Sequence, residues 1–243
     1  MQINKNLKFI IFCLSVFLSF DSHTDEGFSI SAVIETPQVE INGNADDPAI
    51  WFNEVDPSLS IVFGTDKYNG VYSYNLSGDI IGFSKSGSMN NIDLRTLNDN
   101  TYIFTTDSSN NTVNVWVYEN SYLHNKSKEG SFALDKIPHH TSKVNFLAYG
   151  LCGGLSKKDE VIIFVTEAKG PGVQLWKFDD VKLSLLNTFN NSNAYESEGC
   201  VFDDENQKFF ISEENKKGVI RSYSLTNKLL LDNKFRIDDR NGN

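Results

Sequence analysis

Four segments of the chain follow one pattern: an apolar strand, an acidic residue, a polar turn and a second strand that ends on an aromatic residue. They are residues 61–74, 102–116, 162–176 and 209–223. Their acidic members are 41, 60 and 47 residues apart, which brackets the spacing of propeller blades of four short strands: Asp66, Asp107, Glu167 and Glu214. Because such repeats bury their faces against one another, the pattern predicts an all-β protein with a β-propeller fold.

A second short motif precedes each repeat. These motifs are residues 45–51, 90–95, 149–152 and 198–200, and each begins a short apolar stretch. In most repeats a polar turn then leads into the next strand, as in a hairpin. We therefore predict that the motifs begin the innermost strands, whose starts surround one end of the central channel. Four carboxylates are then expected to meet there: Asp46, Asp47, Asp93 and Glu198.

Carboxylates that meet at one end of a channel repel one another, and burial increases the cost of their charge. Calcium is the expected counter-ion, because it takes six to eight oxygen ligands from carboxylates, carbonyls and water. Each acidic residue taken singly also has a structural alternative, since Asp often caps a turn. Their recurrence at equivalent points of successive repeats favours the metal site.

The composition and the remaining motifs exclude other classes of function. The formal net charge of −10 argues against a nucleic-acid partner, which requires clustered Lys and Arg. The four histidines have no zinc-type spacing, and the chain has no Gly-x-Ser-x-Gly elbow and no glycine-rich phosphate loop with its lysine. A phosphate ester remains compatible with the negative charge only if bound cations invert the local field.

The N-terminus predicts a signal peptide over residues 1–22, followed by one domain over residues 23–243. Lys5 and Lys8 precede an apolar run, residues 9–20, that is too short to span a bilayer. The mature protein is therefore expected to be secreted or periplasmic, without a membrane span. Cleavage removes Cys13 and leaves Cys152 and Cys200, which form either a disulfide or two buried thiols.

At these same residues the sequence resembles the β-propeller phytases, a family of calcium-dependent, 3-phytase-like enzymes. The likeness extends from Pro37 to Leu231. It rests on six motifs that follow one another in order along the chain, namely residues 45–51, 64–67, 90–95, 149–152, 198–200 and 212–214. Residues 45–51 and 90–95 are the specific signatures, and the shorter motifs count through their order and spacing.

The resemblance implies a six-bladed propeller that holds Ca²⁺ at the top of its channel and hydrolyses phosphate monoesters of inositol phosphates, phytate above all. The implied calcium ligands are Asp46, Asp47, Glu198, Glu213 and Glu214. The implied residues of the phosphate site are Lys67, Tyr149 and Lys169, together with the signature residue Arg95, whose role is structural or electrostatic. The implied partner is a small phosphate ester.

The sequence also departs from the family pattern. Gly43 stands where the family has an aspartate, Ser108 where it has an arginine, and Tyr68 where many members have a second lysine. The chain ends at Asn243, after four repeats and where a fifth blade is expected. An open arc would expose apolar blade faces, so we expect self-association or a partner that completes the ring. The alternative function is a non-catalytic, calcium-stabilised propeller that serves as a binding module.

Overall fold

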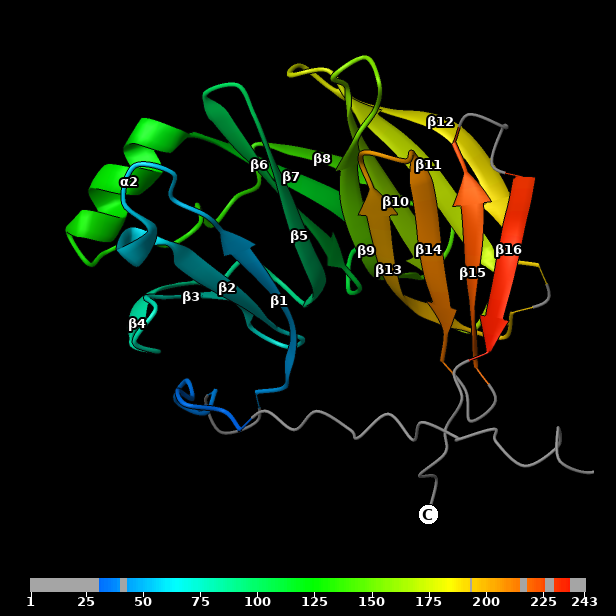
Figure 1. Cartoon of the computed structure of the whole chain (residues 1–243). Coiled ribbons are helices and arrows are strands. Elements are labelled where there is room, and N and C mark those ends of the chain that lie inside the picture. The colour runs from blue at the N-terminus through cyan, green and yellow to red at the C-terminus, as the bar shows by residue number, and fades with distance from the viewer. Residues whose placement is uncertain (1–30, 40–42, 193, 215–217, 226–229, 237–243) are drawn as a thin grey trace, which may run out of the picture. The chain divides into compact units, whose positions relative to one another are not determined.

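The computed structural model contains four antiparallel sheets, each built from four consecutive strands (Figure 1). The first sheet consists of β1 (Ala45–Trp51), β2 (Ile61–Asp66), β3 (Gly70–Tyr74) and β4 (Ile80–Ser84). The second consists of β5 (Met89–Leu97), β6 (Asn100–Asp107), β7 (Thr112–Glu119) and β8 (His140–Lys143). The third consists of β9 (Ala148–Leu155), β10 (Val161–Glu167), β11 (Gly172–Phe178) and β12 (Leu183–Asn190). The fourth consists of β13 (Ser197–Asp203), β14 (Lys208–Glu213), β15 (Val219–Ser224) and β16 (Leu230–Arg236).

The structure describes residues 31–39, 43–192, 194–214, 218–225 and 230–236. Contacts divide the chain into Met1–Val33 and Ile34–Asn243, and all four sheets belong to the second unit. The predicted signal peptide, with Cys13, and the C-terminal Asn243 lie outside the described residues. No helix within the described ranges is long and apolar enough to cross a membrane.

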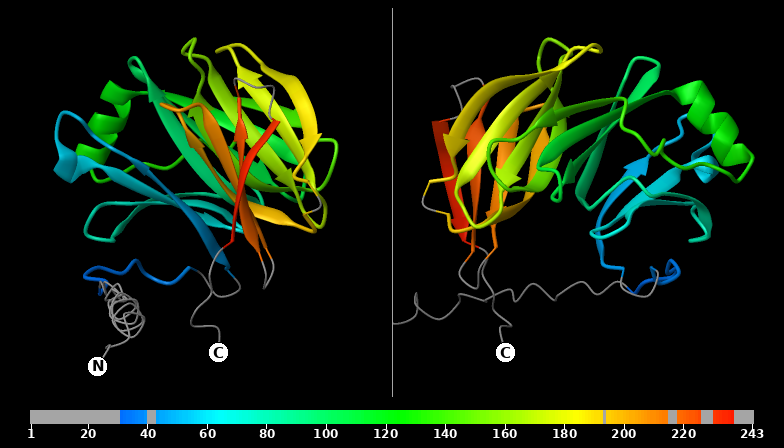
Figure 2. Two further views of the ribbon diagram at one scale, coloured as in Figure 1. Left: turned by 45° about the vertical axis from the view of Figure 1, so that its right-hand side comes forward. Right: turned by 180° about the vertical axis from the view of Figure 1, so that it is seen from behind.

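The sheets are the blades of a propeller, which confirms the all-β fold expected from the repeats. The innermost strands β1, β5, β9 and β13 contact one another in sequence order, and Figure 2 shows the blades following one another around them. In the part of the chain that the structure describes, two short helices lie in the connections: η1 (Pro57–Leu59) joins β1 to β2, and α2 (Asn120–Lys128) follows β7.

Each blade buries its apolar face against the next one, so the core is divided into three clusters. Between the first and second blades, Trp51 and Phe63 pack with Trp116. Phe104 and Ile163 belong to the cluster between the second and third blades. In the last cluster Phe164 stacks on Phe209 with ring centroids 4.0 Å apart, joining the third and fourth blades. The apolar residues of the repeats thus provide the interfaces between blades.

Every innermost strand has a β-bulge near its start. Two residues of the innermost strand oppose one residue of its neighbour between Ala45 and Pro48, between Met89 and Ile92, between Ala148 and Leu151, and between Ser197 and Cys200. A bulge inserts one residue into the strand and turns side chains away from strict alternation. The four bulges coincide with the short motifs that precede the repeats.

A disulfide joins Cys152 of β9 to Cys200 of β13, with 5.6 Å between the Cα atoms. This resolves the two alternatives for these cysteines in favour of the bridge. The bond links the innermost strands of the third and fourth blades just beyond their bulges. It therefore fixes two blades that the chain otherwise joins only through β10–β12 and their turns.

Replacing Cys200 by Ser is expected to lower the free energy of unfolding by about 4 kcal/mol. The physical reason is that the bridge closes a loop between residues 48 positions apart and restricts the unfolded chain. Urea unfolding without reductant measures the loss. Cys152→Ser is expected to give the same loss, and the double variant to add nothing, because each change opens the same bond. Additive losses would contradict the bridge.

Candidate functional site

The candidate site lies where the innermost strands begin, at one end of the channel. The bulges of the four blades place Asp46, Asn90, Tyr149 and Glu198 at equivalent positions. A second set of equivalent residues follows the second strand of each blade: Lys67, Ser108, Ala168 and Glu214. The backbone N–H of each of these donates to a carbonyl that precedes the innermost strand of the same blade, at 2.9–3.1 Å. These eight positions form the rim of the channel.

Lys67 is the centre of a charged cluster on this rim. Its Nζ lies 3.0 Å from Asp46 Oδ1 in the same blade and 3.7 Å from Glu198 Oε1 in the fourth blade. The ammonium also lies over the ring of Tyr149, 5.6 Å from its centroid. Tyr149 in turn donates its hydroxyl to Glu214 Oε2 at 3.1 Å. The cluster brings together residues separated by up to 168 positions in sequence, Asp46 to Glu214.

The cluster holds more negative than positive charge, and its pKa values reflect this. Burial raises the pKa of Glu198, and the nearby Glu214 carboxylate raises it further against the opposing effect of Lys67. Burial alone would lower the pKa of Lys67, but the hydrogen bond and charge of Asp46, with Glu198 and Glu214, raise it. Burial and the same glutamates hold the pKa of Tyr149 well above its usual range, so its hydroxyl stays protonated. The site therefore favours an additional cation.

Asp47 points away from Lys67 and toward the second blade. Its Oδ2 accepts from Asn91 Nδ2 at 3.1 Å and from the Ile92 backbone N–H at 3.0 Å. Burial nevertheless raises the pKa of this carboxyl, with Asp46 and Asp93 adding repulsion. Asp46 and Asp47 both belong to the bulge of β1, which turns their side chains in different directions. Asp46 therefore faces the cluster around Lys67, whereas Asp47 joins the first blade to the second.

Comparison with known proteins agrees with this arrangement. The sequence profile of the family described as Phytase matches residues 6–227 of the chain. The chain belongs to the phytase family. A 3-phytase of Bacillus subtilis (strain 168) is 27% identical over 203 residues, which cover 78% of this chain and 51% of that protein. The chain thus spans about half the length of this curated relative.

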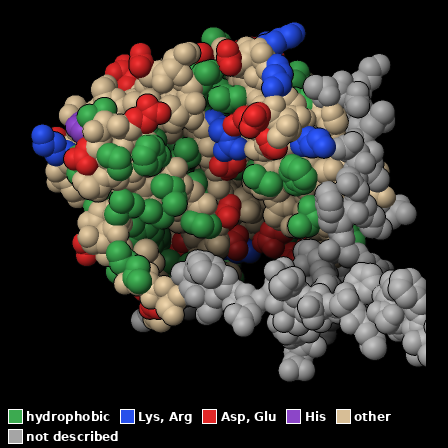
Figure 3. Space-filling view, viewed as in Figure 1, with side chains coloured by type: hydrophobic (Ala, Val, Ile, Leu, Met, Phe, Trp, Pro, Cys, Tyr) green, Lys and Arg blue, Asp and Glu red, His purple; other side chains and the backbone are tan. Residues whose placement is uncertain are grey.

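One solved structure has a fold similar to that of this phytase-family chain. A functionally unknown protein from Desulfotomaculum acetoxidans DSM 771 superposes with a TM-score of 0.50 at 11% identity. The match covers 76% of this chain and 56% of that protein. At so low an identity the likeness concerns the architecture alone. Acidic side chains recur along the middle of the face shown in Figure 3, with lysine and arginine side chains among them.

Asp93 lies deeper in the channel than the sequence motif indicated. The residues at the start of β5 are Asn90 and Asn91, and Asp93 follows after the bulge, paired with Phe104. Its Oδ2 accepts from the Gly153 N–H at 2.8 Å, and its Oδ1 lies 3.1 Å from Arg95 Nη1. Asp93 therefore lies three positions beyond the residue of β5 that is equivalent to Asp46, although its charge still acts on Asp47.

Arg95 crosses from the second blade to the fourth. Its Nε lies 3.0 Å from Asp204 Oδ2, and Nη2 donates to the Phe202 carbonyl at 3.3 Å. Together with Asp93 it connects three blades below the rim. In this phytase-family chain the Arg95 guanidinium is thus paired with carboxylates and donates to backbone carbonyls.

Two further predicted site residues lie beside the cluster and have other partners. Glu213 forms a largely buried ion pair with Arg221, Oε2 to Nη1 at 3.3 Å, and accepts from the Tyr195 N–H. Lys169 occupies the turn after β10 with a φ of +57°, and its backbone N–H donates to Glu196 at 3.2 Å. The Lys169 side chain is exposed, so it can turn toward a ligand above the rim.

The pairing of the strands corrects one residue equivalence that the sequence repeats predicted. The equivalent of Asp66, Asp107 and Glu167 is Glu213, because it pairs with the first residue of its innermost strand as they do. The sequence repeats had placed Glu214 there, one position too far. Asp66 and Asp107 accept hydrogen bonds from the turns that follow them, which is the capping role considered as the alternative.

The site also contains residues that the sequence argument missed. Asn91 was included in a motif but not given its role as the partner of Asp47. The hydroxyls of Thr65, Thr106 and Thr166 lie opposite the first three bulges. The signal that reveals them is a Thr directly before the acidic residue in each of these repeats.

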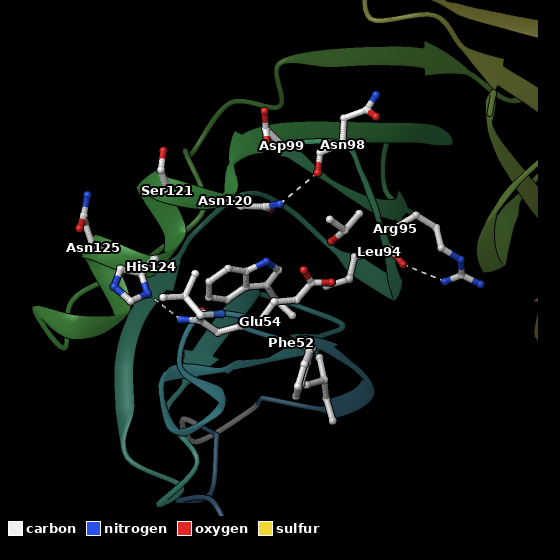
Figure 4. A pocket seen from close by; sticks show the side chains of 15 residues that line it. Phe52, Glu54, Leu94, Arg95, Asn98, Asp99, Asn120, Ser121, His124 and Asn125 are labelled. Atoms are coloured by element: carbon white, nitrogen blue, oxygen red, sulfur yellow. Dashed lines mark hydrogen bonds between the residues drawn. The ribbon is translucent and has the colours of Figure 1, made fainter.

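A pocket of about 650 Å³ lies at the other end of the first two blades (Figure 4). It is lined by residues from the end of β1, the β5–β6 turn and α2, among them Phe52, Glu54, Asp99 and His124. Figure 4 shows the Arg95 guanidinium turned away from Glu54 and Asp99. Since the cluster around Lys67 lies where these strands start, the pocket is separate from the candidate site.

The raised pKa of Glu198 predicts that this carboxyl contributes less to the free energy of unfolding as pH rises. A carboxyl whose folded-state pKa lies above 4.5 binds its proton more tightly in the folded protein, so deprotonation costs stability. Without divalent cations, the free energy of unfolding of the wild type minus that of Glu198→Gln is expected to decrease from pH 4.5 toward neutrality. Denaturant unfolding at a series of pH values measures this difference.

Glu160→Gln is a control variant, for which the change of this free-energy difference with pH is expected to have the opposite sign. The hydrogen bond from Lys177, 3.1 Å from Glu160, lowers the pKa of this carboxyl, so its contribution is present above pH 4.5 and is lost as pH falls. The corresponding difference is therefore expected to increase with pH. The same slope for both variants would contradict the assigned surroundings of Glu198.

Proposed function

We propose that this chain is a calcium-dependent phosphoric monoester hydrolase that acts on phytate or related inositol phosphates. The observation that carries the proposal is the cluster around Lys67. It brings together one ammonium, one phenol and three carboxylates at one end of the channel, and these groups come from three different blades. Phosphoryl transfer depends on positive charge and hydrogen-bond donors placed at the phosphate oxygens. Membership of the phytase family and the 3-phytase relative support the reaction.

The donor atoms of the cluster fit calcium by their chemistry. Asp46, Glu198 and Glu214 supply hard carboxylate oxygens, and burial together with the Glu214 carboxylate raises the pKa of Glu198. Within the described ranges no three His, Cys, Asp or Glu side chains are arranged to hold a metal ion. The ammonium of Lys67 lies between Asp46 and Glu198 and is their present counter-ion.

We assign Asp46, Glu198 and Glu214 to the metal, with Asp47 holding the second blade beside them. A bound calcium ion would supply the positive charge that neutralises phosphate oxygens and lowers the pKa of a bound water. Lys67 would bind the transferred phosphoryl group as a point charge, and Tyr149 would donate its hydroxyl, which its raised pKa keeps protonated. The exposed Lys169 would bind an outer phosphate. Secretion through the predicted signal peptide is part of the same proposal.

The alternative is a propeller that binds calcium without catalysis. It is favoured by the residues that stand where the family pattern has charged groups. Ser108 occupies the rim position equivalent to Lys67, and its N–H and hydroxyl both contact the Ser88 carbonyl. Tyr68 is exposed beside Lys67. The rim thus has fewer cations for a polyphosphate than the family pattern provides, so calcium binding and turnover are tested separately.

Calcium is expected to raise the melting temperature of the wild-type chain, and a chelator to reverse the effect. A ligand that binds only the folded state stabilises it by about 2.7 kcal/mol at 100 times its Kd. Glu214→Gln, which keeps an acceptor for Tyr149, is expected to weaken calcium binding at least about tenfold, as measured by calorimetry. Glu160→Gln, far from the rim, is the control with unchanged affinity. An unchanged response in Glu214→Gln would remove this residue from the metal site.

Phosphate release from phytate is expected to require calcium and Lys67. Loss of one electrostatic contact to a transferring group typically lowers kcat by about 10²-fold, so Lys67→Met is expected to lose at least that much. A phosphate-release assay with saturating calcium measures it. Lys177→Met, which breaks only the ion pair with Glu160, is the matched control. Calcium binding without phosphate release by the wild type would establish the binding module instead.

A further inference from the structure

A repeated hydroxyl link connects the bulges of successive blades. The first link is made by Thr65, whose Oγ1 accepts from the Asp47 N–H at 2.9 Å in its own blade. The same hydroxyl donates to the Asn90 carbonyl of the second blade at 2.8 Å. One side chain thus ties the bulge of β1 to the bulge of β5.

The second and third blades repeat the arrangement. Thr106 Oγ1 accepts from the Asn91 N–H at 3.3 Å and donates to the Tyr149 carbonyl at 2.6 Å. Thr166 Oγ1 donates to the Ser197 carbonyl, next to Glu198. All three threonines are buried, with at most 1% of their surface exposed. Ser212 occupies the fourth position, where its hydroxyl donates to the Gly199 carbonyl of its own blade at 3.1 Å.

Each link holds the backbone of a residue in the candidate site or next to it. Thr65 holds the backbone of Asp47, Thr106 holds that of Tyr149, and Thr166 holds the residue before Glu198. A bulge has lost part of its ladder, so the hydroxyl supplies hydrogen bonds that the strands do not. A buried carbonyl or N–H without a partner is costly, which makes each link specific for a hydroxyl at that position.

We propose that Thr65, Thr106 and Thr166 are positioning residues, which set the rim side chains of one blade relative to the next. The catalytic consequence of this inference rests on the proposed function. The position of the rim side chains does not depend on turnover and can be measured separately. The threonines touch neither metal nor phosphate. They act through the backbone of Asp47, Tyr149 and the residue preceding Glu198.

Thr106 gives the sharpest test, because its strand contains a matched control. Thr106→Val keeps the shape and removes the hydroxyl, whereas Thr106→Ser keeps the hydroxyl. Thr101 lies at the other end of β6, is equally buried, and donates to Asn120 Oδ1 at 2.7 Å, away from the rim. Thr101→Val therefore reports the effect of losing a buried hydroxyl elsewhere in the same strand.

The expected catalytic result is a fall in kcat/KM for phytate of roughly 10- to 100-fold in Thr106→Val. Thr106→Ser is expected to restore most of the activity, and Thr101→Val to leave it unchanged. In a Tyr149→Phe background, Thr106→Val is expected to cost much less, because the hydroxyl that it positions is already gone. Additive losses in this double-mutant cycle, or the same loss in Thr101→Val, would overturn the proposal.

A second measurement reports the position of the Tyr149 side chain and does not require phosphate release. In full-length protein labelled with ¹³C at the tyrosine ζ-carbon, Tyr149→Phe identifies the Tyr149 resonance by its loss. This resonance is expected to shift in Thr106→Val but not in Thr106→Ser or Thr101→Val. If the wild type releases no phosphate, the proposed function fails while this shift still supports the link. An unchanged Tyr149 resonance in folded Thr106→Val would refute the link whatever the activity.

Discussion

Each blade of this propeller buries its apolar face against the next blade, and the rest of the structure depends on that contact. The innermost strands approach most closely: Gly150 of β9 faces the Glu198 carbonyl of β13 so closely that a Cβ atom has no room. The disulfide between Cys152 and Cys200 crosses the same pair of strands. Tight packing of these strands brings their starts together at one end of the channel, and the chemistry lies there because of it.

The rim combines two opposing demands. Close approach of the blades brings carboxylates together, which raises the pKa of Glu198 and of Asp47 through burial and like charge. Lys67 offsets part of this repulsion and at the same time joins the first blade to the fourth. The same group that stabilises the cation-free rim is therefore the group we assign to the phosphate. A cation bound at these carboxylates would neutralise the same negative charge that the ammonium of Lys67 offsets. Metal binding is therefore linked to the availability of Lys67 for the phosphate.

The fold and the general location of the site could be predicted from sequence, because both follow from repeats. Strand, acidic residue and turn recur in every blade, and the motifs before them begin the innermost strands. The individual roles could not be read in this way, because a bulge shifts the register by one residue. Asp46 and Asp47 are adjacent in a bulge and face different neighbours, and Asp93 lies beyond its bulge. At the end of β14 two adjacent glutamates fit the repeat, and it is Glu213 rather than Glu214 that pairs with the first residue of the innermost strand. Periodicity identifies strands, but it does not determine which residue of a bulge points into the channel.

Arg95 shows how the two ends of the channel differ. With Asp93 and Asp204 it forms a network across the second, third and fourth blades, below the rim. Its positive charge is paired with two carboxylates, whereas Lys67 on the rim is shared among an excess of them. A paired guanidinium stabilises the arrangement of blades, and an unbalanced cluster is able to bind an added cation. The larger excess of carboxylates around Lys67 is what distinguishes the candidate site from the structural network beneath it.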